Sequence, residues 1–216
     1  MILGIIVFDS RFLREALLDS VLEASGLPTI REARGLLSRA RERICLVATV
    51  LRDSVFSEEG LRRLERLVKG YPVELEKRVV EEWAWKLPEP RVEVLGRLGG
   101  RLVFYAVPSD ILLSPFYLSL AAASDAWSPS APARCPRGRV VLYVVPGLPC
   151  TKALYYSLPI VLHCEEAELW VVDAEEAIGQ GYGIPSDRVP AFMAPSGRVK
   201  LYAPNSVDEA LRAWTE

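Results

Sequence analysis

The spacing of apolar and polar residues along the chain predicts strands and helices in alternation. Short apolar runs bounded by turn residues are typical of buried strands, and apolar residues that recur every three or four positions are typical of helices. Strands are predicted at residues 2–8, 44–51, 91–96, 101–107, 139–145, 168–173, 190–195 and 197–203. Helices are predicted at residues 12–26, 29–43, 57–70, 73–87, 114–124, 150–163, 174–183 and 206–214.

The order of these elements suggests an internal repeat. Residues 139–216 follow the order strand, helix, strand, helix, strand, strand, helix, and residues 2–124 show the same order with an extra helix after each of the first two helices. The stretch GGRLVFYAVPSDI (99–111) resembles SGRVKLYAPNSVD (196–208), and a proline opens the strand before each. The shared order and the similar stretches together favour a duplication. We therefore predict two tandem α/β units.

The boundary between the units is predicted from composition. AWSPSAPARCPRG, residues 126–138, is rich in proline, serine and alanine and is typical of a linker. We therefore predict a first unit at residues 1–125 and a second at 139–216, each with a central mixed sheet flanked by helices. In the first unit, Gly99 and Gly100 are expected to provide the positive φ angles of a hairpin turn.

Composition and charge narrow the classes of function. The chain has 216 residues, is half apolar and carries a net charge of -2, which gives no general attraction for nucleic acid or anionic lipid. About seven apolar residues precede Asp9 and no basic region accompanies them, so we expect no signal peptide, no membrane partner and a cytoplasmic location. Arginine outnumbers lysine 21 to 5, and the chain has one asparagine and one glutamine, which suggests a thermophilic source.

The cysteines and the histidine do not form a metal-site pattern. Cys45, Cys135, Cys150 and Cys164 lack the paired spacing of zinc ligands, and His163 is the single histidine, so we predict no metal and no cofactor. In an ordinary cytoplasm the thiols are expected to be reduced, although hyperthermophiles do contain intracellular disulfides. Cys164 is expected about 20 Å from Cys150 along one helix, and Cys135 at the opposite end of a strand, so neither should pair with Cys150.

The turn sequence PGLPCTK (146–152) resembles the active-site motif of thioredoxin-like proteins. That family has W-C-G-P-C-K between a strand and a helix, so Pro149 and Cys150 match its proline and its second cysteine. Gly147 stands where the family has its nucleophilic first cysteine. The first unit has FDSR (8–11) after its first predicted strand and no cysteine there. The resemblance therefore implies active sites that have lost the dithiol.

Two further motifs extend the resemblance over the whole second unit. YGI (182–184), followed by Val189 and Pro190, resembles the segment that ends in the family's cis-proline, and SGRV (196–199) resembles its turn between the last two strands. The element order is that of the thioredoxin fold. With two such units, the chain is similar to the archaeal protein disulfide oxidoreductases, which are tandem thioredoxin domains.

Two interpretations of Cys150 stay open. A thiol at the start of a helix faces unpaired N–H groups and the positive end of the helix dipole, which favours the thiolate, and Lys152 would act in the same direction. A cis-proline at Pro190 would hold an extended peptide beside the thiol through main-chain hydrogen bonds. Alternatively, Cys150 is a small packing residue, since free cysteine is among the most buried residue types.

The main hypothesis is a thioredoxin-fold protein without redox chemistry that binds a protein or peptide partner, either in a groove beside the second turn or along an exposed sheet edge. The binding residues predicted for the groove are Pro146, Gly147, Pro149, Lys152, Val189 and Pro190. The first alternative is a single-cysteine thiol–disulfide oxidoreductase with Cys150 as nucleophile. Whether the protein is an enzyme is open, and association of copies of the chain is a further possibility.

A third hypothesis comes from aspartates that follow predicted strands. Asp9, Asp53, Asp110 and Asp173 lie where α/β proteins often bind ligands, and the first elements also resemble a PIN-type nuclease with a metal at Asp9 and Asp53. Acidic residues after strands are equally ordinary helix N-caps. Capping would explain both positions without a metal.

Overall fold

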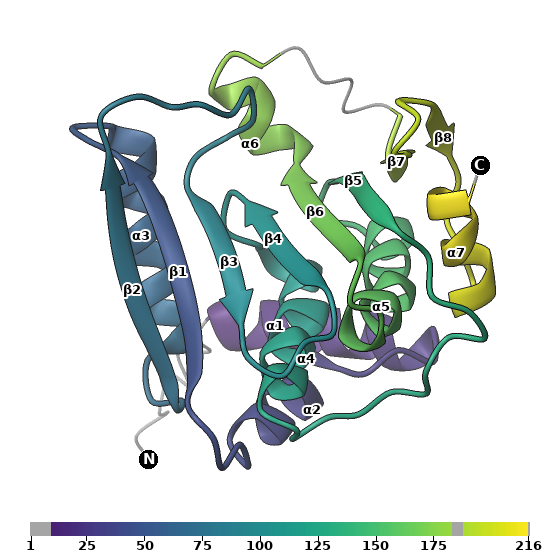
Figure 1. The fold of residues 1–216 in the computed structure, drawn as a ribbon. Coiled ribbons are helices and arrows are strands. Elements are labelled where there is room, and N and C mark those ends of the chain that lie inside the picture. Colours follow the sequence, from purple (N-terminus) through teal and green to yellow (C-terminus); the bar gives the residue numbers. More distant parts are fainter. Residues whose placement is uncertain (1–9, 183–187, 216) are drawn as a thin grey trace, which may run out of the picture.

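The computed structural model describes residues 10–182 and 188–215. These residues contain an eight-stranded mixed sheet with the order β2-β1-β3-β4-β6-β5-β7-β8, flanked by helices (Figure 1). The strands are β1 (Ile44–Leu51), β2 (Val73–Val80), β3 (Arg91–Leu95), β4 (Arg101–Tyr105), β5 (Gly138–Val144), β6 (Ala167–Asp173), β7 (Ala191–Met193) and β8 (Val199–Leu201). The helices are α1 (Ser10–Ala24), α2 (Ile30–Leu37), α3 (Val55–Val68), η1 (Asp110–Leu112), α4 (Leu113–Ala123), α5 (Leu148–His163), α6 (Ala174–Gly179) and α7 (Val207–Thr215). Within this described part, no helix has the length and apolar character that a membrane crossing needs.

The two halves of the sheet repeat one arrangement. In the first half, β1 pairs in parallel with β2 and antiparallel with β3, and β3 pairs antiparallel with β4. In the second half, β5 pairs in the same way with β6 and β7, and β7 with β8. A parallel pairing of β4 with β6 makes the sheet continuous. The predicted α/β fold with mixed sheets and flanking helices is confirmed, while the unit boundaries at residues 125 and 138 stay a prediction.

The prediction of a helix at residues 73–87 is wrong, because the first eight of these residues form β2. This strand pairs with β1 along its whole length, and residues 81–90 contain neither helix nor strand. Glutamate, leucine, lysine and arginine favour helices only weakly, and the pairing edge of β1 overrides that preference. Val73 and Leu75 pack against the core while the glutamates that follow them are exposed, which is the period-two pattern of a strand.

The first half starts its repeat at β1 and not at residues 2–8, which lie outside the described residues. The elements β1, α3, β2, β3, β4 and α4 correspond to β5, α5, β6, β7, β8 and α7, with residues 81–90 in the place of α6. Two helices, α1 and α2, precede this repeat, and a capping box of Thr29 and Glu32 starts α2. The turn of the first half therefore follows β1, which corrects the prediction that placed it at residues 8–11.

The sheet separates two hydrophobic clusters. On one face, side chains of α1, α2, α3, α4, α5 and α7 form a continuous core with the sheet, and Phe104 and Phe116 are fully buried in it. The other face has a smaller cluster around Tyr105, covered by Trp83, Trp85 and the short helix α6. Residues 81–90 therefore cover this face of the sheet without forming a helix, on the same side as α6.

The hairpin between β3 and β4 uses its glycines for close packing. Neither Gly99 nor Gly100 has a positive φ, so the predicted reason for these glycines is wrong. Their N–H groups donate to the end of α5, from Gly99 to the carbonyl of Leu162 over 3.0 Å and from Gly100 to that of Val161 over 2.8 Å. A Cβ at Gly100 would lie 2.5 Å from the carbonyl oxygen of Cys164. The missing side chains thus let the first half dock on the second.

Candidate functional site

The turn of the second half joins β5 to α5 and carries Cys150. Gly147 is the N-cap of α5, and Pro149 and Cys150 are the second and third residues of the helix. The N–H of Val145 donates to Sγ of Cys150 over 3.4 Å. Cys150 is 2% exposed, whereas Pro149 beside it is exposed. The turn therefore presents its proline to solvent and covers its thiol.

Burial raises the pKa of Cys150 to about 11. The Val145 N–H lowers the pKa and the charge of Asp173 raises it, but the loss of hydration is the largest effect. Lys152 donates to Oδ1 of Asn205 over 3.4 Å. The start of a helix was expected to favour the thiolate, and the pKa moves in the opposite direction because the thiol is buried. Cys150 is therefore protonated at neutral pH.

Pro190 lies beside this turn, just before β7. The Val189–Pro190 bond is cis, as the resemblance implied. Ala191 pairs with Tyr143 near the end of β5, and this register brings Pro190 next to the turn that follows β5. Among the described residues, none forms a hydrogen bond with the main chain of Val189. The last two residues of the YGI motif lie outside the described part of the chain.

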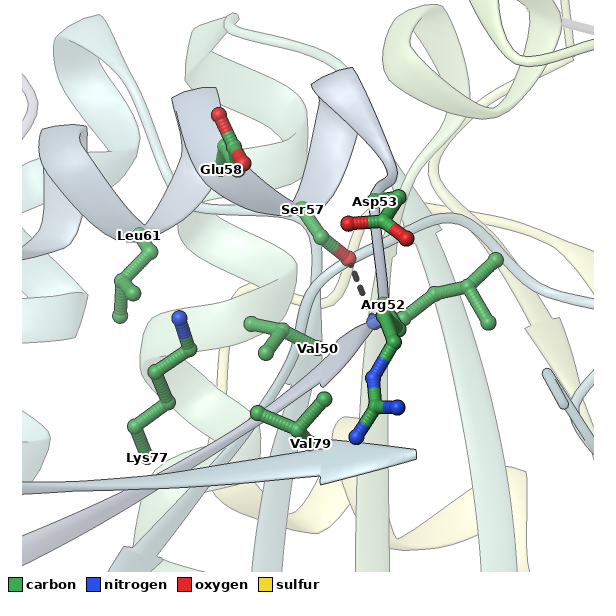
Figure 2. Close-up of a pocket in the computed structure, with 9 residues that line it drawn as sticks. Val50, Arg52, Asp53, Ser57, Glu58, Leu61, Lys77 and Val79 are labelled. Carbon is green, nitrogen blue, oxygen red and sulfur yellow. Dashed lines mark hydrogen bonds between the residues drawn. The ribbon is translucent and has the colours of Figure 1, made fainter. Parts of the chain in front are cut away.

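The first half has an equivalent turn between β1 and α3 that the sequence analysis did not identify. Ser54 is the N-cap of α3, and Oγ of Ser57, three residues later, accepts the N–H of Leu51 over 2.9 Å (Figure 2). Cys150 has the same place after Gly147 and accepts a corresponding N–H. Ser54 and Ser57 therefore occupy in this half the positions that Gly147 and Cys150 occupy in the other. The sequence signal was a serine pair with the spacing of the cysteines.

A buried hydrogen bond links this turn to the residue before Pro90. Oγ of Ser57 donates to Oε2 of Glu89 over 2.6 Å, and both residues are buried. The Glu89–Pro90 bond is cis, like the bond before Pro190. In α3, Gly60 allows close packing, since a Cβ there would lie 2.8 Å from Cγ of Pro90. Each half thus combines a helix-starting turn with a cis-proline.

A cavity of about 280 Å³ lies beside the first turn, between α3 and the edge of the sheet (Figure 2). Aliphatic side chains form part of its lining, and Arg52, Asp53 and Lys77 add charged groups. At the start of α3, Val55 is 69% exposed and Phe56 is 47% exposed. The first turn therefore presents apolar side chains to solvent beside a mixed apolar and charged hollow.

The aspartates of the nuclease hypothesis do not form a metal site in the described part of the chain. Asp53 has a positive φ of 57°, while Asp173 is the N-cap of α6 and accepts the N–H groups of Glu175 and Glu176. Asp9 lies outside the described residues. No group of three or more His, Cys, Asp or Glu side chains that could hold a metal occurs among the residues described. Capping accounts for Asp173 without a metal.

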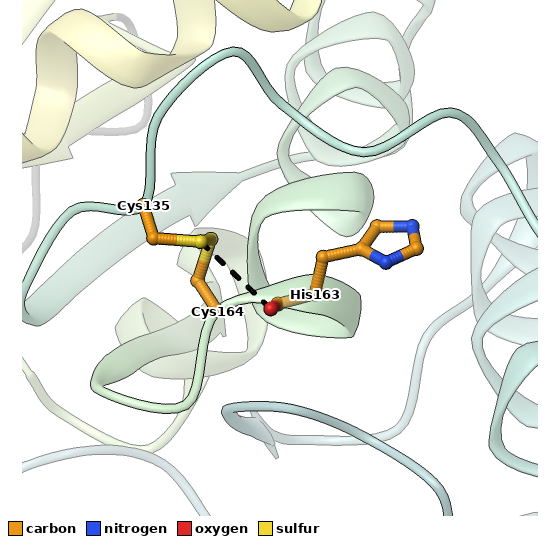
Figure 3. Close-up of a disulfide and its surroundings, with 3 residues drawn as sticks. All are labelled: Cys135, His163 and Cys164. Carbon is orange, nitrogen blue, oxygen red and sulfur yellow. Dashed lines mark hydrogen bonds between the residues drawn. A yellow bond between two sulfur atoms is a disulfide. The ribbon is translucent and has the colours of Figure 1, made fainter.

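Cys135 and Cys164 form a disulfide away from both turns (Figure 3). This corrects the expectation of reduced thiols for the pair. Cys135 precedes β5 and Cys164 follows α5, so both lie at the end of the sheet opposite Cys150, with Cα atoms 5.2 Å apart. The ring of His163 points away from the sulfur atoms. The other two cysteines, Cys45 and Cys150, are free thiols, so neither turn holds a dithiol.

Comparisons with known proteins agree with this architecture. No protein-family model matches the chain, and no curated protein sequence matches it. The alkylhydroperoxide reductase protein AhpF from Enterococcus faecalis matches in structure with a TM-score of 0.66 and 15% identity, over 85% of this chain and 96% of that chain. A protein disulfide oxidoreductase from Aeropyrum pernix K1 matches with a TM-score of 0.55 and 16% identity, over 85% of this chain and 90% of that chain. At such identities the likeness shows the fold. The chain therefore has a thioredoxin-like fold, in an arrangement that resembles that of the archaeal protein disulfide oxidoreductases.

Proposed function

We propose that this chain is a thioredoxin-fold protein that binds a protein or peptide partner in the groove beside Cys150 and Pro190, without exchanging disulfides there. The observation that carries the proposal is the state of Cys150, which is 2% exposed and has a pKa raised to about 11. Disulfide exchange needs a thiolate that can reach its substrate. With Gly147 in the place of the first cysteine, this turn keeps the shape of an active site without its nucleophile.

The groups around this turn suit an extended peptide. The N–H and carbonyl of Val189 have no hydrogen-bond partner among the described residues and precede a cis-proline. An extended peptide can pair with such a main-chain donor and acceptor as an added strand does. The exposed ring of Pro149 offers an apolar contact, and Lys152 adds a positive charge one turn along the helix. The partner we propose is therefore an extended, largely apolar segment of another protein.

Binding of an unfolded polypeptide tests the groove. The probe is fluorescein-labelled α-lactalbumin, reduced and carboxymethylated so that it stays unfolded, and the readout is fluorescence anisotropy. We expect Pro149→Asp to raise the dissociation constant by about ten-fold, because a charge replaces an apolar contact. Val199→Asp, at an exposed position of the edge strand β8, is the matched control and should bind as the wild type does. If Val199→Asp alone weakens binding, the sheet edge is the site, and a wild-type chain that binds no probe contradicts the proposal.

Thiol–disulfide exchange by Cys150 alone is the alternative function, favoured by the redox enzymes among the structural neighbours. Alkylation of the native protein by iodoacetamide at about pH 7, located by peptide mass spectrometry, separates the two functions. We expect Cys150 to react only after unfolding, because the thiol is covered and protonated. Cys45 is partly exposed and serves as the internal control. Rapid alkylation of native Cys150, with loss of disulfide reduction in Cys150→Ser, would establish the enzyme instead.

A further inference from the structure

The side chain of Gln180 is paired with the main chain of Glu89, 91 residues earlier in the sequence. The N–H of Glu89 donates to Oε1 of Gln180 over 2.7 Å, and Nε2 of Gln180 donates to the carbonyl of Glu89 over 2.9 Å. Both hydrogen bonds therefore connect one carboxamide with the donor and the acceptor of one residue. Gln180 is the single glutamine of the chain and lies at the C-cap of α6.

A carboxamide carries the same donor and acceptor as a peptide group. Gln180 thus makes with Glu89 the pair of hydrogen bonds that a residue of an extended peptide would make. We propose that Gln180 is an internal stand-in for a bound peptide, which closes a peptide-binding site on the first half of the molecule. The ligand of that site is the main chain of an extended polypeptide, and it binds only when the Gln180 side chain withdraws.

The surroundings of Glu89 support a binding site. A hollow of about 180 Å³ adjoins the pair and is lined in part by Phe56, Arg63, Glu89 and Pro90. Phe56 is 47% exposed and belongs to the turn equivalent to that of Cys150. A peptide paired with Glu89 would therefore lie beside an apolar side chain and beside side chains of both charges, since Glu176 also lines the hollow.

The contrast with the second half supports the role of Gln180. At Val189, the equivalent of Glu89, the main chain forms no hydrogen bond with any described residue. A residue before a cis-proline in this chain therefore does not need a carboxamide partner for its main chain.

The attachment of Gln180 is local. It follows a helix of six residues, α6, which buries Ala174 and Ala177 and forms an ion pair of 3.6 Å between Glu176 and Arg63. The Gln180 side chain is only half-buried and lies at the end of this helix, so its two hydrogen bonds can break by rotation of one side chain while α6 stays packed. Withdrawal of Gln180 therefore does not require the sheet to unfold.

Removing the carboxamide tests the proposal with the unfolded α-lactalbumin probe. Gln180→Met keeps the length of the side chain and removes both hydrogen bonds, and Gln180→Ala removes the side chain altogether. The variants are made in the Pro149→Asp background, which weakens the groove at Val189. We expect both to bind the probe roughly ten-fold more tightly than Pro149→Asp alone, because the two hydrogen bonds of Gln180 no longer have to be broken. Ile178→Ala, at an exposed position of α6, is the matched control in the same background and should bind as Pro149→Asp alone does. Hydrogen exchange of the Glu89 amide should accelerate in the Gln180 variants and slow again when the probe is added.

A second substitution locates the new binding. In the Gln180→Met background, Phe56→Ser should cancel the gain, because Phe56 lines the hollow next to Glu89. Equal binding with and without the Gln180 substitution in the Pro149→Asp background, or a gain that Phe56→Ser leaves intact, would overturn the proposal. This outcome is separate from the groove at Val189. If that groove does not bind, the wild type binds no probe and the Gln180 variants still bind it.

Discussion

Breaking the disulfide between Cys135 and Cys164 is expected to lower the free energy of unfolding by about 3.5 kcal/mol, as the chain-entropy relation gives for a loop of this length. The bond closes a loop between residues 29 positions apart. It connects residues 126–137, which contain no helix or strand, to the end of α5. Without the bond, the conformational entropy of the unfolded chain rises more than that of the folded chain.

Urea unfolding followed by tryptophan fluorescence measures this effect in oxidised wild type, reduced wild type and Cys135→Ser. Cys135 is exposed, so its replacement by serine should change little apart from the lost bond. We expect reduced wild type and Cys135→Ser to unfold alike, and added reductant to leave the variant unchanged. A variant as stable as oxidised wild type would show that the bond contributes nothing to stability.

Gly100→Ala is expected to destabilise the protein by about 3 kcal/mol, near the upper end of what overpacking costs. A Cβ at Gly100 would overlap the carbonyl oxygen of Ala167 and lie 2.5 Å from that of Cys164. Both contacts are with main-chain atoms, which cannot move aside as a flexible side chain can. The hairpin of the first half would have to lift from the end of α5, and the hydrogen bond from Gly100 to Val161 would weaken.

Gly35→Ala is the matched control for this prediction. Gly35 lies inside α2, its φ is not positive and a Cβ there would have no neighbour within 4 Å. Alanine is the better helix former, so this change should stabilise the protein by up to about 1 kcal/mol. Thermal or urea unfolding of the two variants gives the comparison. Equal changes in the free energy of unfolding would mean that position 100 does not need glycine for close packing.

The second half was predictable because its evidence is local. The strand before Pro146, the helix start at Cys150 and the proline at Pro190 each leave a pattern within a few residues, and together they indicate the thioredoxin-like order. The direction in which the pKa of Cys150 shifts was not predictable, because two opposing effects act on it. The helix start favours the thiolate and burial opposes it, and only the packing of the folded chain shows that burial is larger.

The first half was harder to predict because its signals are weaker and partly misleading. The residues of β2 favour helix by composition, and the strand forms because β1 offers a pairing edge. Its turn has Ser54 and Ser57 where cysteines would have marked it. The first turn was predicted at residues 8–11 because the first apolar run of the chain resembles the first strand of the repeat.

The sequence alone was enough to predict the α/β class, the order of elements in the second half, the second turn with its missing first cysteine, and the equivalence of Pro90 with Pro190. Periodicity and short motifs encode these features, because each leaves a pattern within a short stretch of the chain. Three features became known only from the folded chain, namely the pairing of Cys135 with Cys164, the burial of Cys150 and the contact of Gln180 with Glu89. Each of these depends on which distant segments meet, and that is set by the joint packing of the whole sheet and its helices.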